Sequence, residues 1–556
     1  MKKNLSFLII LISLYSCAQT NQLDKIEAVD NLFKKWNNSS SPGVAIGIIQ
    51  DGELLYSKGY GLANLEHNIP NSPQIAFNIG SNTKQFTAAC IVLLSQQGKL
   101  DLNQSLSSIY PDFPEYAKNI TIKNLLYHTS GLRDYAQITY LSGLRPDDYY
   151  NDDDILKWIK SQKELNYPTG EQYLYCNSGY WLLGQIVKKM SGMSLANFAK
   201  KEIFEPLGMT NTHFLDNNTM VIKQRASGYS PSRSGDFRNI SSTLEHTGDR
   251  GIYTTVEDMK KWDDEFYNRK ILKDNFWELM TTQGVLNDEE TIDYAFGLEM
   301  KKHKGLKTID HGGRVPGFWS NIIRFPEQRF SVIVFTNTSG ANATPLGYQI
   351  ADIFLKEKFK APTEDNKPER EIKFIKLSNE ILEKYEASYW NNDEKFSRKV
   401  FLKNDTLMFQ RGPRSIHPLA PIASNEFKVL DTPPFIKAFV KFEKTDNNYL
   451  LNITTNDVKG NPMEVYTPVV YSTNDLQSFL GKYYSEEINT YYEFKMEEER
   501  IRLYLNGRKT VLLRHVRDEL FTSPMCDFQF VKSGQNIQGV KISTPRVKNL
   551  SFVRVK

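Results

Sequence analysis

Residues 79–100 read IGSNTKQFTAACIVLLSQQGKL, and this stretch decides the fold of the first part of the chain. Its apolar side chains recur at helical spacing, which predicts one packed helix over 81–97; they are Phe86, Ala89, Cys90, Leu93 and Leu94. Gly98 can end that helix in the left-handed conformation. Ser81 is therefore expected at or beside the N-cap, where backbone N–H groups lack partners and the helix dipole is positive.

Lys84 follows Ser81 by three positions, so the two side chains share a face of the helix and can approach each other. The dipole and burial both favour the neutral, basic form of the amine. A serine beside a lysine base is one form of activated nucleophile. Taken alone, the pair fits an ordinary N-cap and a solvated lysine equally well, because both residue types are common.

Length and composition limit the function classes. The chain has 556 residues, enough for more than one domain, and its net charge is +4 with no basic cluster, so nucleic acid is not an expected partner. Four cysteines in the whole chain make neither a disulfide framework nor a zinc cluster. No histidines show ligand spacing, so we expect no metal and no cofactor.

The N-terminal sequence MKKNLSFLIILISLYSCAQT combines a basic start with a short apolar run. This pattern predicts an export signal over residues 1–17 rather than a membrane span. Cys17 directly after the apolar run resembles the lipidated cysteine of bacterial lipoproteins, although bulky Tyr15 leaves plain cleavage nearby as an alternative. We expect an exported bacterial protein, periplasmic or on the cell envelope, whose contact with the membrane is a lipid anchor only.

Three regions follow the signal. Residues 22–358 mix strands and helices, and the first strands and the last, 330–337, are similar enough to pair in one antiparallel sheet. Residues 359–376 are charged, contain proline and read as a linker. Beyond them, short alternating runs at an offset of 94 residues (476 − 382) predict two antiparallel β-barrels, 377–470 and 471–556.

Three further clusters in the first region bear on Ser81. Tyr175-Cys176-Asn177 precedes an expected helix over 177–191 and offers a phenol for proton transfer and an amide for a substrate. His311-Gly312-Gly313 precedes a strand, where glycines let a ligand approach the backbone and N–H groups can stabilise an oxyanion. His128-Thr129-Ser130-Gly131 reads as a scaffolding turn. Each cluster is weak alone, and a histidine in a glycine turn is more often structural.

The order of these motifs is specific. Ser-x-x-Lys, His-Thr-Ser-Gly-Leu, Tyr-x-Asn and His-x-Gly occur in sequence, and together the chain from about 35 to 345 resembles the serine β-lactamase and penicillin-binding-protein superfamily. The most similar branch comprises class C β-lactamases, D-aminopeptidases, DD-carboxypeptidases and esterases. The resemblance implies an α/β (α+β) catalytic domain with a central antiparallel sheet flanked by helices, followed here by the two small β-barrels, which resemble lipocalins.

The resemblance also implies roles for the matching residues. Ser81 would be the nucleophile that forms an acyl-enzyme, and Lys84 and Tyr175 would share general base and acid duty. Asn177, His311 and Gly313 would bind the substrate. The backbone N–H groups of Ser81 and Arg314 would form the oxyanion hole, and no metal takes part.

Two departures narrow the expected substrate. Cys176 replaces the usual serine and should point away from the substrate. His311 stands where many members have lysine, and because histidine is largely neutral at pH 7, it favours substrates with a neutral or amino end over a carboxylate. Asp249 and Arg250 stand where relatives have small residues. They are either a surface ion pair, which we favour, or part of the site.

The sequence therefore predicts a serine hydrolase of small amides or esters, with peptides that contain D-residues as the expected substrates. The alternatives are a β-lactamase or penicillin-binding DD-carboxypeptidase, and a non-catalytic protein that binds cell-wall fragments. The barrels either narrow the specificity of the site with a loop or only stabilise and attach the protein. The loop over 133–165 has no derivable course, and the oligomeric state stays open.

Overall fold

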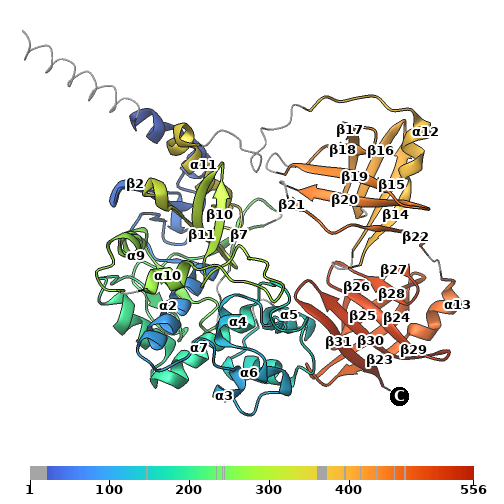
Figure 1. Ribbon diagram of the computed structural model, residues 1–556, viewed down its shortest axis with the longest axis horizontal. Helices are drawn as coiled ribbons and strands as arrows, with labels where there is room; N and C mark the ends of the chain where they lie inside the picture. The colour runs from blue at the N-terminus through green and yellow to red at the C-terminus, as the bar shows by residue number, and fades with distance from the viewer. Residues whose placement is uncertain are drawn as a thin grey trace, which may run out of the picture. The chain divides into compact units, whose positions relative to one another are not determined.

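The computed structural model describes residues 22–555 apart from 146–147, 233, 241, 243, 274, 360–371, 393–395, 413–414, 433–435, 456–457 and 469–470. The predicted signal peptide with Cys17 and most of the predicted linker lie outside the described residues. The chain divides into two compact units (Figure 1). The first comprises Met1–Ala136 and Arg145–Asn366, and the second comprises Gln137–Leu144 and Lys367–Lys556.

The first unit is built on a six-stranded antiparallel sheet. Its strand order is β10 (Glu299–His303), β11 (Leu306–Val315), β12 (Phe318–Phe325), β13 (Phe330–Thr336), β1 (Val44–Gln50), β2 (Glu53–Tyr60). The pairing of β1 with β13 runs from Val44 opposite Thr336 to Gln50 opposite Phe330, so the first strands and the last do share one sheet as predicted. All seven residues of β13 are buried, because both faces of this central strand are covered.

Helices cover both faces of the sheet. The longer ones are α2 (Thr83–Gln96), α6 (Asp152–Ser161), α7 (Asn177–Ser191), α9 (Val256–Asn268) and α11 (Ala343–Leu355). Short helices lie between them: α3 (Leu106–Ile109), α4 (Ile122–Leu126), α8 (Leu195–Ala199) and α10 (Phe276–Thr281). Most of α5 (Tyr135–Leu141) belongs to the second unit. One core cluster joins α11 to the sheet through residues such as Ile350 and Val332. On the other face, Val256 of α9 lies over Gly47, where a side chain would collide with it.

The second unit contains two nine-stranded antiparallel sheets, each curled into a nearly closed barrel. The first runs β14 (Ala387–Asn391), β15 (Phe396–Lys403), β16 (Thr406–Gly412), β17 (Ser415–Pro421), β18 (Glu426–Val429), β19 (Ala438–Lys444), β20 (Tyr449–Thr455) and β21 (Val458–Lys459), with β22 (Glu464–Tyr466) closing against β14. The second runs β23 (Gly481–Ser485), β24 (Thr490–Glu497), β25 (Arg500–Leu505) and β26 (Arg508–Leu512), then β27 (Arg514–Arg517), β28 (Leu520–Thr522), β29 (Asp527–Ser533), β30 (Asn536–Thr544) and β31 (Val547–Arg554), which pairs with β23. The fold class predicted from the sequence is confirmed.

The two barrels open in the same way. In the first, α12 (Asn379–Leu382) precedes β14, and the hydroxyl of Tyr389 donates to the carbonyl of Tyr385 at 3.0 Å. In the second, α13 (Thr473–Leu476) precedes β23, and the hydroxyl of Tyr483 donates to the carbonyl of Phe479 at 2.9 Å. Each of these features recurs 94 residues further along the chain, the offset read from the sequence.

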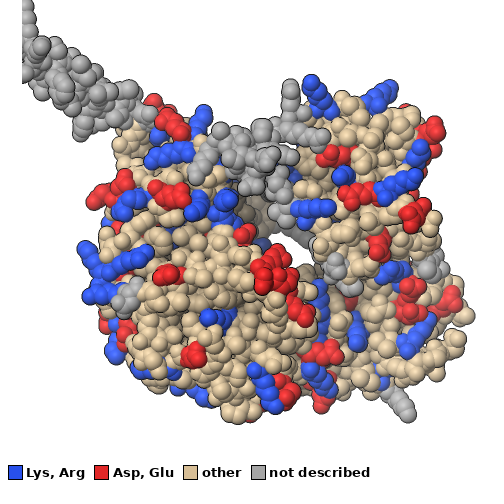
Figure 2. Space-filling model, viewed as in Figure 1, with Lys and Arg blue, Asp and Glu red and all other residues tan. Residues whose placement is uncertain are grey.

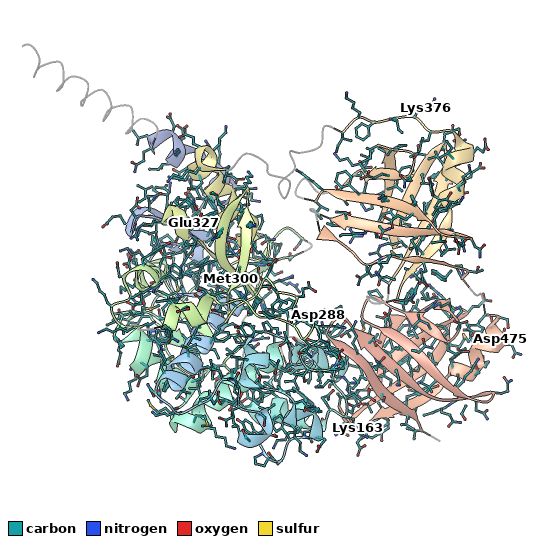
Figure 3. The ribbon with its side chains drawn as sticks, viewed as in Figure 1. Lys163, Asp288, Met300, Glu327, Lys376 and Asp475 are labelled. Carbon is teal, nitrogen blue, oxygen red and sulfur yellow. The ribbon has the colours of Figure 1, made fainter. Side chains whose placement is uncertain are left out.

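The surface charges agree with the nearly balanced composition. On the face that Figure 2 shows, basic and acidic side chains are interspersed over the first unit. Positions of this unit that Figure 3 labels include Met300 on β10, Glu327 after β12, and Asp288 in the exposed acidic segment 288–290 that precedes β10. In the part of the chain that the structure describes, no helix is long and apolar enough to span a membrane.

Candidate active site

Ser81 lies in a single 3₁₀ turn, Gly80–Asn82, between β5 (Phe77–Asn78) and α2. The amide of Gly80 donates to Asn78 Oδ1 at 2.9 Å, which ties the turn to the strand before it. Gly80 has φ +53°, and a Cβ there would lie 2.7 Å from the backbone nitrogen of Arg314, so this turn needs glycine. The serine therefore sits beside the N-terminus of α2, one of the two positions that the sequence allowed.

Lys84 is fully buried on the first turn of α2. Its Nζ donates to Asn177 Oδ1 at 2.9 Å, to the carbonyl of Asp249 at 2.9 Å and to Ser81 Oγ at 3.3 Å. It also lies 4.8 Å from the ring centroid of Tyr175. A buried amine is costly unless its hydrogens are bonded, and here three segments of the chain supply acceptors. The structure thus brings together four residues that the sequence singled out, Ser81, Lys84, Tyr175 and Asn177.

Asp134 orients Asn177. One carboxylate oxygen of Asp134 accepts from both the backbone N–H and the side-chain Nδ2 of Asn177, each at 3.0 Å. Asn177 Nδ2 is therefore directed to Asp134, and its Oδ1 is left for Lys84. Sequence analysis missed Asp134, which lies in the loop whose course could not be derived. An acid directly after the His-Thr-Ser-Gly-Leu-Arg run was the available signal.

Cys176 and His128 hold the segment that carries Tyr175 and Asn177 through contacts inside the protein. Cys176 is buried, its Sγ lies 3.3 Å from the carbonyl of Leu132, and burial raises the pKa of its thiol to about 12. It is thus an unreactive thiol turned into the protein, as predicted. His128 adopts φ +59°, and its Nδ1 accepts from the backbone N–H of Cys176 at 3.1 Å. The predicted scaffolding turn therefore contacts the segment that carries Tyr175 and leads into α7.

His311, on β11, is neutral and fixed in one tautomer. Its Nδ1 lies 2.6 Å from the carbonyl of Gly312, which can only accept, so Nδ1 carries the hydrogen. Nε2 then accepts from the hydroxyl of Tyr294 at 3.1 Å. Burial lowers the pKa of His311 to about 4, so the ring carries no charge near neutral pH, as the sequence predicted. Tyr294 is a second neighbour of the site that sequence analysis did not find.

Gly313 lets β11 pass close to the serine turn. A Cβ on Gly313 would lie 1.9 Å from the carbonyl oxygen of Ile79 and 2.3 Å from Ser320 Oγ, so no other residue fits. This approach places the Arg314 backbone nitrogen beside the turn that carries Ser81. The Arg314 side chain is exposed, with its guanidinium 4.5 Å from the Trp319 ring centroid. Only the backbone of Arg314 thus lies beside the serine turn, while its guanidinium lies over the Trp319 ring.

Asp249 and Arg250 are not a surface pair, and the favoured expectation was wrong. Asp249 is 1% exposed, and its Oδ2 accepts from Tyr135 Oη at 2.8 Å and from Arg250 Nε at 3.2 Å. Burial opposes its ionisation, but the positive charges of Arg250 and Lys84 prevail and hold the pKa of Asp249 below its usual value. Two adjacent charged residues in a sequence usually indicate a position on the surface. Here the packing of Lys84 and Tyr135 against Asp249 shows that the pair is buried beside the site.

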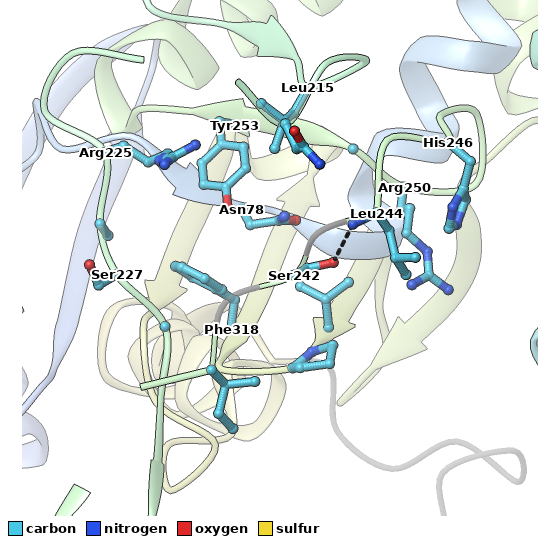
Figure 4. Close-up of a pocket in the computed structure, with 17 residues that line it drawn as sticks. Asn78, Leu215, Arg225, Ser227, Ser242, Leu244, His246, Arg250, Tyr253 and Phe318 are labelled. Atoms are coloured by element: carbon cyan, nitrogen blue, oxygen red, sulfur yellow. Dashed lines mark hydrogen bonds between the residues drawn. The ribbon is translucent and has the colours of Figure 1, made fainter. Parts of the chain in front are cut away.

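A cavity of about 400 Å³ adjoins this constellation (Figure 4). Its wall includes Asn78, which holds the serine turn, Val315, which follows Arg314, and Arg250 with Gly251. Apolar side chains such as Leu215 and Phe318 complete it. Among the described residues, no group of three or more His, Cys, Asp or Glu side chains is placed to hold a metal ion.

Comparison with known proteins identifies the first unit. Residues 29–353 match the family model described as Beta-lactamase, which is more than half of the chain. The chain belongs to the beta-lactamase family. The serine turn with Ser81, helix α2, the Tyr175 segment and strand β11 lie within the matched residues, and the resemblance found in the sequence is confirmed.

Relatives with curated names extend this placement. The chain is 29% identical over 300 residues to a D-aminopeptidase of Gluconobacter oxydans, covering 54% of this chain and 56% of that protein. It is 27% identical over 304 residues to a D-aminopeptidase of Brucella canis, covering 54% and 58%. The chain thus spans a little over half the length of these curated relatives.

Solved structures show the same fold. The octameric penicillin-binding protein homologue from Pyrococcus abyssi superposes with a TM-score of 0.55 at 26% identity, covering 80% of this chain and 98% of that chain. D-amino acid amidase from Ochrobactrum anthropi SV3 in complex with L-phenylalanine gives 0.51 at 20% identity, covering 60% and 98%. At that identity the amidase supports the shared fold alone.

Proposed function

We propose that this member of the beta-lactamase family is a serine hydrolase that cleaves small amides or peptides containing D-residues by way of an acyl-enzyme on Ser81. The observation that carries the proposal is the 3.3 Å contact between the Ser81 hydroxyl and the buried Lys84 amine. A hydroxyl becomes nucleophilic when an adjacent base takes its proton, and this base is held on the serine by Asn177 and the Asp249 carbonyl.

The arrangement supports each step of acyl transfer. Ser81 Oγ attacks the substrate carbonyl while its proton passes to Lys84, with Tyr175 beside it to hand the proton to the leaving amine. The N–H groups of Ser81 and Arg314 stabilise the negative oxygen that forms. Water then attacks the ester on Ser81, and the serine regains its proton.

Two observations favour a D-residue amide as the substrate. The curated relatives that the chain resembles are D-aminopeptidases. In addition, His311 is neutral where many members of the family have a charged lysine, so this position offers no fixed charge to a substrate carboxylate. Asn177 and Gly313 would complete the binding of the scissile group.

The experiment compares the protein lacking residues 1–17 with Ser81→Ala and with Ser95→Ala, a control serine near the end of the helix that follows the serine turn. Each is assayed on D-alanine and L-alanine p-nitroanilides and on a chromogenic cephalosporin. We expect turnover of the D-amide over the L-amide, lost in Ser81→Ala and kept in Ser95→Ala. Turnover of the cephalosporin alone would make the protein a β-lactamase, and Ser81-independent or absent turnover would overturn the proposal.

We further propose that the protein is exported and anchored through lipid on Cys17, and that the two barrels are lipocalin-like modules. The first proposal rests on the N-terminal sequence pattern, and the second on two curled nine-stranded sheets that repeat at a fixed offset. The intact mass of the mature protein tests the anchor. A diacylated or triacylated Cys17 at the N-terminus is the expected result, and an unmodified N-terminus would contradict it.

A further inference from the structure

The cavity whose wall includes Asn78, the residue bonded to the serine turn, and Val315, which follows Arg314, is cationic. Two arginines, Arg225 and Arg250, line it, and no aspartate or glutamate is among the described residues of its wall. Figure 4 shows the two arginines on opposite sides of the view, with Asn78 and Ser242 between them. The histidine of the wall, His246, does not change this balance, because burial and the nearby Arg250 lower its pKa to about 3 and leave it neutral.

The two guanidinium groups are held differently. Arg250 is fixed through Nε on the buried Asp249, and its terminal nitrogens make no hydrogen bond to any described residue. Arg225 is exposed, and its guanidinium carbon lies 5.7 Å from the ring centroid of Tyr253, another residue of the wall. No described acid lies within ion-pair distance of Arg225. The Arg225 guanidinium and the terminal nitrogens of Arg250 are thus donors at the cavity wall without a described acceptor, whereas the Nε of Arg250 is paired with Asp249.

An arginine in a concave, partly apolar wall is suited to one class of ligand. Its parallel N–H groups match the two oxygens of a carboxylate, and the interaction is stronger where water is excluded. A neutral amide of the same shape can accept only at one oxygen and carries no charge. The cavity should therefore discriminate between an acid and its amide, which have nearly equal size.

We propose that Arg225 and Arg250 select substrates that carry a carboxylate near the scissile bond. This inference rests on the proposed hydrolase function and names its substrate class. The two arginines complement His311. The neutral His311 ring offers no positive charge on the β11 side of the site, and Arg225 and Arg250 supply positive charge in the cavity wall. The carboxylate can belong to an acidic side chain, as in a D-glutamyl residue, or to a free C-terminus.

Matched substrate pairs test the selection. The first pair is D-glutamic acid α-p-nitroanilide and D-glutamine p-nitroanilide, and the second is D-alanyl-D-alanine and D-alanyl-D-alaninamide. We expect kcat/KM to favour the acid of at least one pair by about tenfold or more, the size of a charge-assisted hydrogen bond. Preference in the first pair assigns the carboxylate to a side chain, and preference in the second assigns it to a C-terminus. Equal rates in both pairs would overturn the inference.

Variants identify the residues responsible. Arg225→Gln and Arg250→Gln should each lower the acid-to-amide ratio at least about fivefold, since the charge is removed and the amide substrate is little affected. Arg238→Gln, which removes an exposed arginine outside the cavity wall, is the control and should keep the ratio. Because the ratio compares two substrates on one variant, a general loss of activity cancels. An unchanged ratio in both cavity variants would overturn the assignment.

Binding to Ser81→Ala separates this inference from the proposed function. Calorimetric titration with D-isoglutamine and with D-glutaminamide measures the same preference without turnover. A preference for the acid that is lost in Ser81→Ala/Arg225→Gln and Ser81→Ala/Arg250→Gln supports the cationic cavity even where no substrate is hydrolysed. If D-amides are turned over but neither rates nor binding favour the acid, the proposed hydrolase function is supported and the proposed carboxylate site is contradicted.

Discussion

Two regions of the first unit bury charged side chains, and they do so in different ways. Between α9 and the sheet, Arg324 donates through Nε to Asp263 Oδ1 at 2.6 Å, Ser331 donates to the same oxygen at 2.9 Å, and both charged residues are at most 2% exposed. At the serine turn, the buried Lys84 donates to the three neutral acceptors described above. The first arrangement pairs opposite charges, and the second keeps an amine beside a hydroxyl.

The difference separates a structural role from a chemical one. Burial raises the pKa of Asp263 although Arg324 opposes the shift, so this acid depends on its partner to stay ionised inside the protein. A neutral Lys84 amine has two N–H groups, and Asn177 Oδ1 and the Asp249 carbonyl can accept both, so its lone pair is left for the Ser81 hydroxyl. We therefore expect changes at Asp263 to alter stability and changes at Lys84 to alter activity.

The largest expected effect is that of Lys84→Met on catalysis. Removing the base should lower kcat/KM for the D-alanine p-nitroanilide by about 10³- to 10⁴-fold. The free energy of unfolding should change by less than about 2 kcal/mol, because the lost hydrogen bonds are offset by the removal of a buried amine. Steady-state kinetics and urea unfolding measure the two quantities. A loss of stability as large as that expected for Asp263→Ala would contradict the chemical role.

Asp263→Ala tests the other half of the comparison. The free energy of unfolding should fall by about 3–5 kcal/mol, because Arg324 is left buried without its partner. The kcat/KM of the folded protein should stay within about threefold, since this pair does not touch the serine turn.

The neighbouring Asp264 provides the matched control. It makes a partly exposed i,i+4 ion pair with Lys260 at 2.7 Å on the same helix. Asp264→Ala should cost only about 0.2–0.5 kcal/mol, as is usual for such pairs. Equal losses for the two substitutions would show that burial of Arg324 is not what makes Asp263 important.

Tyr175→Phe sharpens the comparison inside the active site. Loss of the phenolic hydroxyl should lower kcat by about 10²- to 10³-fold if it transfers a proton, with a smaller change in KM. Tyr173→Phe, two residues earlier and exposed, is the control and should remain within about threefold of the wild type. Equal effects of the two substitutions on kcat would contradict a catalytic role for Tyr175.

The smallest effect is a pH dependence of stability that comes from His246. Its pKa is lowered from 6.5 to about 3 by burial first and by Arg250 second, so between those pH values the unfolded chain binds a proton that the folded protein does not. This histidine should therefore lower the free energy of unfolding by up to about 1.4 kcal/mol for each pH unit below 6.5.

The measurement compares wild type with His246→Gln by urea unfolding at pH 7.5 and pH 5.5. The difference between the two proteins isolates His246 from other groups, above all Asp310. Burial raises the pKa of Asp310 to about 7, so between pH 3.8 and 7 the folded protein binds a proton that the unfolded chain does not. The contribution of Asp310 to the free energy of unfolding therefore falls as the pH rises towards 7, opposite to that of His246. The variant should lose less stability than the wild type at pH 5.5, and parallel losses would contradict the assignment.

Local patterns predicted much of this structure. The helical spacing in 79–100 and the glycine after it gave α2, whose observed span Thr83–Gln96 differs by one or two residues from the expectation, and Gly98 indeed has φ +69°. The helix expected over 177–191 was found with the same bounds. These predictions succeeded because the pattern of burial along one helix depends on residues that are close together in the sequence.

The sequence by itself determined the family, the division into a mixed helix-and-strand region and a β-barrel region, and the residues at the serine turn. Motif order and periodicity, on which these predictions rest, are properties of the chain alone. Only the tertiary structure decided that Asp249 is buried, that its carbonyl binds Lys84 across 165 residues, that Asp134 orients Asn177, and that two arginines face one cavity. The physical reason is that a charged residue is stable either in water or against a partner, and which of the two applies depends on segments distant in sequence that only packing brings together.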